Sequence, residues 1–145
     1  MKLTRDTIRM VLIDDAVNDR ELLQFALTQA GFTHPLTPFE SAGIALDYFT
    51  NAKAVGAELP HLVLLDLNMP VVDGVRALAL VREAAECREL PVIILTGSDD
   101  VNKRRELAHL GIFSFLKKQH DNANVVAALD DFIGLYNDVV LAPSK

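Results

Sequence analysis

Four short apolar runs, separated by stretches with helical spacing, constrain the fold of this chain more than any other feature. The runs cover residues 8–13, 62–65, 92–95 and 112–116. Apart from Arg9 and Ser114 these short runs are apolar throughout, which is typical of strands that are buried on both faces of a sheet. A weaker run at residues 36–39 is interrupted by Pro38, which predicts a fifth strand near an edge of the sheet.

The stretches between these runs carry apolar residues at helical intervals. The expected helices cover residues 17–30, 41–54, 74–87, 100–110 and 122–140. Ser41 is a suitable cap for the second helix, and Gly31 and Gly111 are stops for the first and fourth. Five strands that alternate with five helices predict an α/β fold, a doubly wound parallel sheet with helices on both faces.

Length and composition predict one globular domain. The 145 residues are 50% hydrophobic and include 14 basic and 20 acidic residues, which gives a net charge of −6. We expect residues 1–145 to form a single domain, with a core at about 7–138 and a C-terminal extension at 139–145. The acidic balance argues against sequence-independent binding to nucleic acid, which needs clustered lysine and arginine.

The sequence also predicts a cytoplasmic protein. Its first residues lack the apolar core of a secretory signal, and no apolar run approaches the about 18 residues of a membrane span. The single cysteine cannot form an internal disulfide, which suits a reducing compartment. We therefore expect no membrane partner.

Polar side chains stand at the carboxyl ends of the four buried runs. Asp14 and Asp15 follow the first run, Asp66 the second, Thr96 the third and Lys118 the fourth. In a parallel sheet these ends meet at one edge, which is where ligands bind. Three carboxylates there would repel one another, so either their pKa values rise or a cation enters. Oxygen ligands with no histidine or cysteine cluster favour Mg²⁺ over zinc, and Asp66 is then a natural nucleophile for phosphoryl transfer.

These residues belong to four motifs that resemble the receiver domain of response regulators in two-component signalling. The motifs are Asp14-Asp15, residues 66–70 with Asp73-Gly74, residues 96–98 and residues 115–118. They follow the family's order on the expected elements, over about residues 7–138. The resemblance implies a flavodoxin-like fold of five βα units with strand order 2-1-3-4-5.

The resemblance implies a role for each acidic residue. Asp66 would accept a phosphoryl group from a sensor histidine kinase or a histidine phosphotransfer protein. Asp15 would bind Mg²⁺ directly, together with Asp66 and the backbone carbonyl of Asn68, and Asp14 would act mainly through metal-bound water.

The resemblance also implies a switch. Thr96 and Lys118 would contact phosphoryl oxygens, and Lys118 is preferred to Lys117 because it lies three residues after Phe115, the expected switch aromatic. Phosphorylation would draw Thr96 inward and let Phe115 rotate into the vacated space. The surface of the fourth helix, the fifth strand and the fifth helix would then change.

Three positions around these motifs carry further expectations. Asn68, two residues after Asp66, and Ser98, two after Thr96, would tune the lifetime of the phosphoryl group. Gln119 stands where receivers usually carry proline, which leaves open whether the peptide bond before it is cis or trans.

The C-terminal region suggests self-association. Residues 131–143 are similar to the tail of stand-alone receivers that serve bacterial phytochromes and related hybrid sensor kinases, which implies a homodimer. The pairing surface would be this end of the chain or the face of the fourth helix, fifth strand and fifth helix. The alternative is a longer helix that lies on its own sheet, since amphipathic helices usually bury their apolar stripe within the same chain.

Two other functions share part of this pattern with a phosphorylated receiver. A haloacid-dehalogenase-like phosphatase also uses a strand-end aspartate and Mg²⁺, but it needs an acid/base aspartate where this chain has Asn68, so we expect no true turnover. A receiver that serves only as a scaffold would not need the intact set of acidic, hydroxyl and ammonium groups. The residues after Val140 are too few for a helix-turn-helix, which argues against a transcription factor.

Overall fold

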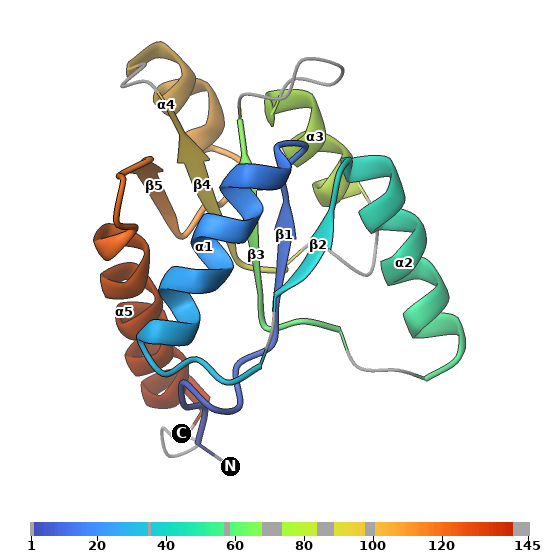
Figure 1. The fold of residues 1–145 in the computed structure, drawn as a ribbon. Helices are drawn as coiled ribbons and strands as arrows, with labels where there is room; N and C mark the ends of the chain where they lie inside the picture. Colours follow the sequence, from blue (N-terminus) through green and yellow to red (C-terminus); the bar gives the residue numbers. More distant parts are fainter. Residues whose placement is uncertain are drawn as a thin grey trace.

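In the computed structural model, strands and helices alternate along the chain (Figure 1). The structure describes residues 2–34, 36–56, 59–67, 74–83, 89–97 and 101–140. The strands are β1 (Met10–Ile13), β2 (Thr37–Phe39), β3 (Leu62–Asp66), β4 (Val92–Thr96) and β5 (Ser114–Lys117). The helices are α1 (Val17–Gln29), α2 (Ala42–Ala54), α3 (Gly74–Glu83), α4 (Val101–Ala108) and α5 (Ala123–Val140).

The strands form one parallel sheet in the order β2-β1-β3-β4-β5, which confirms the predicted fold. The register pairs Ile13 with Leu65 and Leu65 with Ile94. Because these pairs lie at or near the ends of their strands, the residues that follow β1, β3 and β4 emerge side by side. The expected edge position of β2 is also confirmed.

Helices cover both faces of the sheet (Figure 1). On one face, alternate strand residues such as Val11 and Ile13 pack with residues of α2, α3 and α4. On the other face, Met10 and Leu12 pack with residues of α1 and α5. The period of two along β1 thus supplies both halves of the core, as expected for a strand that is buried on both sides.

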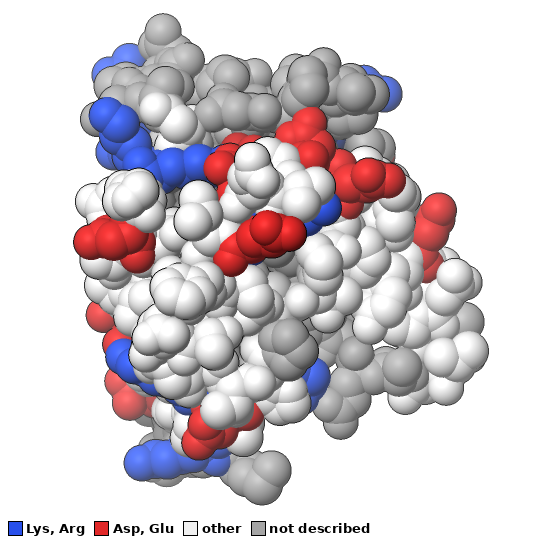
Figure 2. Space-filling model, viewed as in Figure 1, with Lys and Arg blue, Asp and Glu red and all other residues white. Residues whose placement is uncertain are grey.

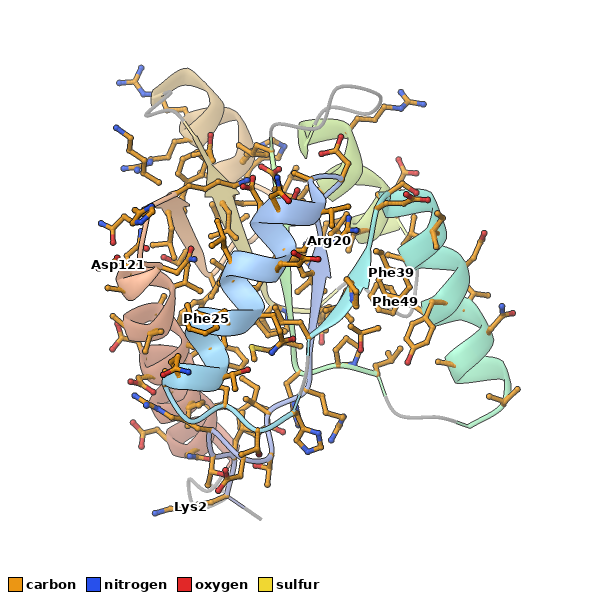
Figure 3. All side chains as sticks on the ribbon, viewed as in Figure 1. Lys2, Arg20, Phe25, Phe39, Phe49 and Asp121 are labelled. Atoms are coloured by element: carbon orange, nitrogen blue, oxygen red, sulfur yellow. The ribbon has the colours of Figure 1, made fainter. Side chains whose placement is uncertain are left out.

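Helices α1 and α2 carry more large apolar side chains than they bury. Leu23 and Leu27 are buried on α1, but Leu22 and Phe25 are exposed. Phe25 points away from the sheet, whereas Phe39 and Phe49 pack against each other between β2 and α2, with ring centroids 6.4 Å apart (Figure 3). A helix against a flat sheet covers it with a narrow stripe, so apolar neighbours on either side of that stripe remain in contact with water.

Within the described residues, the observed ends of the helices and strands agree with the predicted ends or differ from them by one or two residues. Ser41 accepts a hydrogen bond from the Ile44 N–H at 3.2 Å, so the predicted cap of α2 is confirmed. Asn122 precedes α5 with a φ of 57° rather than belonging to it. The predicted ends of α3 at residue 87 and of α4 at residue 100 lie outside the described residues.

The N-terminal segment is fastened to α5. Asn137 accepts a hydrogen bond from the Leu3 N–H at 2.8 Å and donates one to the Leu3 carbonyl at 2.9 Å. Arg5 forms an ion pair with Asp130 at 2.5 Å. Within the described residues, no helix has the length and apolar character that crossing a membrane requires.

Candidate functional site

Every strand of the sheet except β2 delivers a polar residue to the same edge. Asp14 follows β1 directly, Asp66 and Thr96 are the last residues of β3 and β4, and Lys118 follows β5. The side chains of Asp14, Asp66 and Thr96 belong to residues that are only 2%, 2% and 1% exposed. A parallel sheet forces this convergence because its strands all end at one edge. Figure 2 shows acidic and basic side chains meeting at the upper end of the molecule, where the strands end.

The first part of the site is a cluster of three carboxylates. Asp14, Asp15 and Asp66 each place one carboxylate oxygen within 4.8 Å of the others, with Asp15 the most exposed. Burial raises the pKa of Asp14 to about 6, while the Ala16 N–H, 2.9 Å from its carboxylate, opposes that rise and the charge of Asp66 adds to it. Such a donor set suits a hard divalent cation, because a cation would remove the repulsion between these groups.

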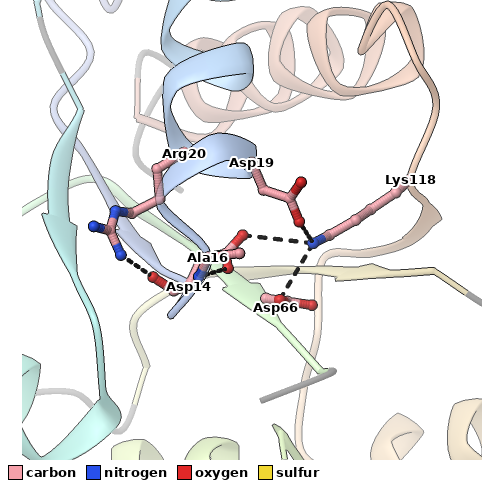
Figure 4. A network of polar contacts seen from close by, with 6 residues as sticks. All are labelled: Asp14, Ala16, Asp19, Arg20, Asp66 and Lys118. Atoms are coloured by element: carbon pink, nitrogen blue, oxygen red, sulfur yellow. Dashed lines mark hydrogen bonds and ion pairs between the residues drawn. The ribbon is translucent and has the colours of Figure 1, made fainter. Parts of the chain in front are cut away.

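The second part of the site is the ammonium of Lys118 (Figure 4). Its Nζ lies 3.2 Å from Asp66, 3.5 Å from Asp14 and 2.7 Å from Asp19. Burial alone would lower the pKa of Lys118, but the hydrogen bond to Asp19 and the charges of Asp66 and Asp14 together raise it above the ordinary value. The side chain therefore stays positively charged among three carboxylates.

Hydrogen bonds to two backbone carbonyls hold the segments around Lys118 and Asp14 in place. The Lys118 N–H donates to the Thr96 carbonyl at 2.6 Å, which ties the segment after β5 to the end of β4. Arg20 donates from Nη1 to the Asp14 carbonyl at 2.6 Å, which ties α1 to the end of β1. A cavity of about 280 Å³ opens beside these contacts, between α1 and the loop before α5, and is lined by Asp14, Lys118 and Gln119 among others.

The structure brings together most of the residues that the sequence singles out. Asp14, Asp15, Asp66 and Lys118 form one cluster, whereas Lys117 is exposed on β5. Thr96 ends the neighbouring strand. Asn68 and Ser98 lie outside the described residues, as does Asp73. The bond before Gln119 is trans, since no peptide bond among the described residues is cis.

Phe115, the expected switch aromatic, is half-buried on β5 and packs against the core on the side of α2, α3 and α4. Its ring also lies under the guanidinium of Arg104 from α4, with Cζ 4.9 Å from the ring centroid. The aromatic side chain is therefore held by packing and by one cation–π contact.

Sequence reasoning missed two residues of this region. Asp19 stands in the first turn of α1, where an acid is commonly assigned to the helix dipole alone. It lies four residues after Asp15, in the first turn of the helix that follows the acidic pair, and this closeness in the sequence was the available signal. Arg104 carried no sequence signal, because its contact with Phe115 depends on how α4 packs on β5.

Comparison with known proteins identifies the family. A family model for the response regulator receiver domain matches residues 10–130. The chain belongs to this family, and the predicted resemblance is confirmed. It is 33% identical over 129 residues to a probable chemotaxis protein CheY from Rhizobium etli, covering 89% of this chain and 95% of that protein.

Two solved structures are similar over most of their length. A response regulator receiver domain from Rhodospirillum rubrum is 30% identical, with a TM-score of 0.73 over 88% of this chain and 94% of that one. The bacteriophytochrome response regulator AtBRR is 28% identical, with a TM-score of 0.70 over 86% of this chain and 91% of that one. Similarity in sequence and similarity in structure thus point to the same family.

Proposed function

We propose that this protein is a single-domain response regulator that accepts a phosphoryl group on Asp66 from a histidine kinase or a histidine phosphotransfer protein. The observation that carries the proposal is the position of Asp66, a buried strand-end carboxylate held between two other acids and the Lys118 ammonium. A carboxylate in this position can act as the nucleophile that accepts a phosphoryl group, and the charges around it suit the phosphoryl oxygens.

The transfer itself needs few groups. An oxygen of the Asp66 carboxylate attacks the phosphorus of a phosphohistidine, the P–N bond breaks, and its electron pair returns to the imidazole nitrogen of the donor. Asp14, Asp15 and Asp66 fit Mg²⁺ by their oxygen donors and mutual repulsion. Asp15 and Asp66 would bind the ion directly, together with the backbone carbonyl of Asn68, and Asp14 would act through metal-bound water. When bound, Mg²⁺ would neutralise charge on the carboxylates and on the phosphoryl oxygens.

Lys118 and Thr96 then hold the product. The Lys118 ammonium, already 3.2 Å from Asp66, pairs with a phosphoryl oxygen, and the Thr96 hydroxyl donates to another. Movement of Thr96 toward the phosphoryl group makes room for Phe115 to rotate inward, which alters the surface of α4, β5 and α5. Asn68 and Ser98 set how long the phosphoryl group persists.

The protein signals by binding, or by passing the phosphoryl group onward, rather than by turnover of a substrate. A phosphatase would need a general acid near the leaving oxygen, and Asn68 is an amide at the position where that acid would stand. We therefore expect at most slow autodephosphorylation, in a cytoplasmic protein without nucleic-acid partners.

The kinase is of the phytochrome type or a related sensor, and the protein forms a homodimer through α5 and the residues after it, or through the face of α4, β5 and α5. On α5, Leu135 and Val139 are 53% and 72% exposed, whereas Asn137 and Asp130 are occupied by the N-terminal segment. Exposed apolar side chains at one end of a helix favour pairing there. The variant Leu135→Glu should shift the mass toward the monomer in light scattering.

The experiment that tests the function is labelling by acetyl phosphate, with and without Mg²⁺, read by intact mass. Wild type should gain one phosphate in an Mg²⁺-dependent reaction that releases acetate, and Asp66→Asn should gain none. Asp47→Asn is a matched control, because Asp47 is an exposed acid on α2. Continuous phosphate release at enzyme-like rates would favour the phosphatase, and neither adduct nor turnover would leave a scaffold.

A further inference from the structure

Among the residues that the structure describes, the nearest charged partner of Lys118 is not the expected phosphorylation site. Its Nζ is 2.7 Å from Asp19, against 3.2 Å from Asp66 and 3.5 Å from Asp14 (Figure 4). Asp19 belongs to α1, whereas the other two carboxylates belong to the ends of β3 and β1. The ammonium is thus shared between the sheet edge and the first turn of a helix.

The three carboxylates differ in how easily they release the ammonium. The Asp19 side chain is 46% exposed, whereas those of Asp14 and Asp66 are 3% and 2% exposed. A buried carboxylate that loses its cation is left without water, but an exposed one is hydrated at once. Asp19 is therefore the partner from which Lys118 can depart at the lowest cost.

We propose that Asp19 is a positioning residue that draws the Lys118 ammonium toward α1 and competes for it with the phosphoryl group. This inference rests on the proposed function, in which Lys118 binds a phosphoryl oxygen. In the unphosphorylated protein Asp19 gives the ammonium a place outside the carboxylate cluster. In the phosphorylated protein its negative charge opposes the transfer of Lys118 to the phosphoryl oxygen.

The proposal predicts opposite effects on two ligands. A cation in the carboxylate cluster repels the ammonium of Lys118, which then moves toward Asp19, so removal of the Asp19 charge should weaken Mg²⁺ binding. The same removal frees Lys118 for a phosphoryl oxygen, so binding of a phosphoryl analogue should become tighter. Because the Asp19 pair is partly exposed, each effect should be about two- to fivefold.

A simpler role for Asp19 is that of an acid near the N-terminus of α1, where it stabilises the helix through its dipole. That role predicts a small loss of stability in Asp19→Asn and no opposed change in the two affinities. The directions of the two affinity changes separate the two explanations, since a loosened helix would weaken the binding of both ligands.

The test is a pair of calorimetric titrations, one with Mg²⁺ alone and one with beryllofluoride at saturating Mg²⁺. Asp19→Asn is compared with wild type and with Glu21→Gln. Glu21 is an exposed acid on the same helix but borders a different hollow, beside Arg20 and Leu36. We expect Asp19→Asn to bind Mg²⁺ more weakly and beryllofluoride more tightly, Glu21→Gln to resemble wild type, and Asp19→Glu to restore both affinities.

A second background distinguishes a direct pair from a long-range charge effect. In Lys118→Met the added substitution Asp19→Asn should no longer tighten beryllofluoride binding, and a persistent gain would overturn the positioning role. Equal behaviour of Asp19→Asn and Glu21→Gln, or weaker binding of both ligands, would also overturn it. If wild type itself fails to bind beryllofluoride with Mg²⁺, it is the proposed function that fails.

Discussion

The three central strands and the outer strand β5 carry different parts of the site and are packed differently. Every residue of β1, β3 and β4 is buried, including Asp66 and Thr96 at the strand ends. In β5 the residues are half-buried and the last, Lys117, is exposed. The carboxylates lie at the end of β3 or directly after β1, whereas Phe115 and Lys118 lie on or directly after β5.

In the proposed function this difference separates the fixed carboxylates at the centre of the sheet from Lys118 and Phe115, which move at its edge, and Thr96 is the central residue that moves with them. Carboxylates that hold a cation and attack phosphorus need fixed positions. A buried strand with a neighbouring strand on each side provides such positions. A residue that responds to phosphorylation needs an alternative place to go. Lys118, with three carboxylate partners, and Phe115, with one cation–π contact and incomplete burial, both have that freedom.

The largest expected effect tests the packing difference itself. Leu64 on β3 is fully buried, and Leu116 on β5 is half-buried against the same core of α1 and α5. Leu64→Ala should cost about 3–4 kcal/mol in the free energy of unfolding, and Leu116→Ala about 1–2 kcal/mol. Urea unfolding of the two variants measures both values. Equal losses would mean that β5 is as firmly packed as the centre of the sheet, which would contradict the proposed difference between the central strands and β5.

Sequence patterns predicted the type and the place of the central strands, although the predicted start of β1 was two residues too early. Runs such as residues 62–65 are apolar at every position, and only a strand buried on both faces explains a run of that length. The strand order followed from the resemblance, and the convergence of Asp14, Asp66 and Lys118 followed from where strands end in a parallel sheet.

Contacts between elements were beyond the sequence. Nothing in a helical pattern says whether Phe25 faces the sheet or water, because that depends on how α1 is rotated against the strands. The pair of Asp19 with Lys118 joins residues 99 positions apart, and its formation depends on the height of α1 above the sheet edge. The contact of Arg104 with Phe115 has the same origin in tertiary packing.

A second, smaller effect should appear in the pH dependence of stability, through the buried carboxyl of Asp14 at the end of β1. Burial raises the pKa of Asp14 to about 6, so the folded protein binds a proton in a range where the unfolded chain has already lost it. Stability from this carboxyl should therefore rise as the pH falls through 6, level off near the ordinary pKa of 3.8, and be lost as the pH rises again.

Between about pH 7.5 and about pH 5 the expected gain is about 1 kcal/mol in metal-free protein. Urea unfolding with a chelator at the two pH values measures it. Asp14→Asn, which has no carboxyl to titrate, provides the reference, and a gain of the same size in that variant would assign the effect to other groups.

The smallest effect concerns the edge, where the cation–π contact of Arg104 with Phe115 opposes rotation of the ring. Arg104→Met keeps an unbranched apolar side chain beside the ring but removes the positive charge. Such a contact on a partly exposed ring is worth about 0.5 kcal/mol, so the inward population of Phe115 should rise roughly twofold in the unphosphorylated protein. NMR of a fluorinated phenylalanine at position 115 measures that population.

Arg105→Met, at the next and exposed position of α4, should leave the inward population of Phe115 unchanged. If both variants gave the same spectrum as wild type, packing alone would hold Phe115. Of the two residues at the edge of the sheet, Lys118 would then be the one that is free to move.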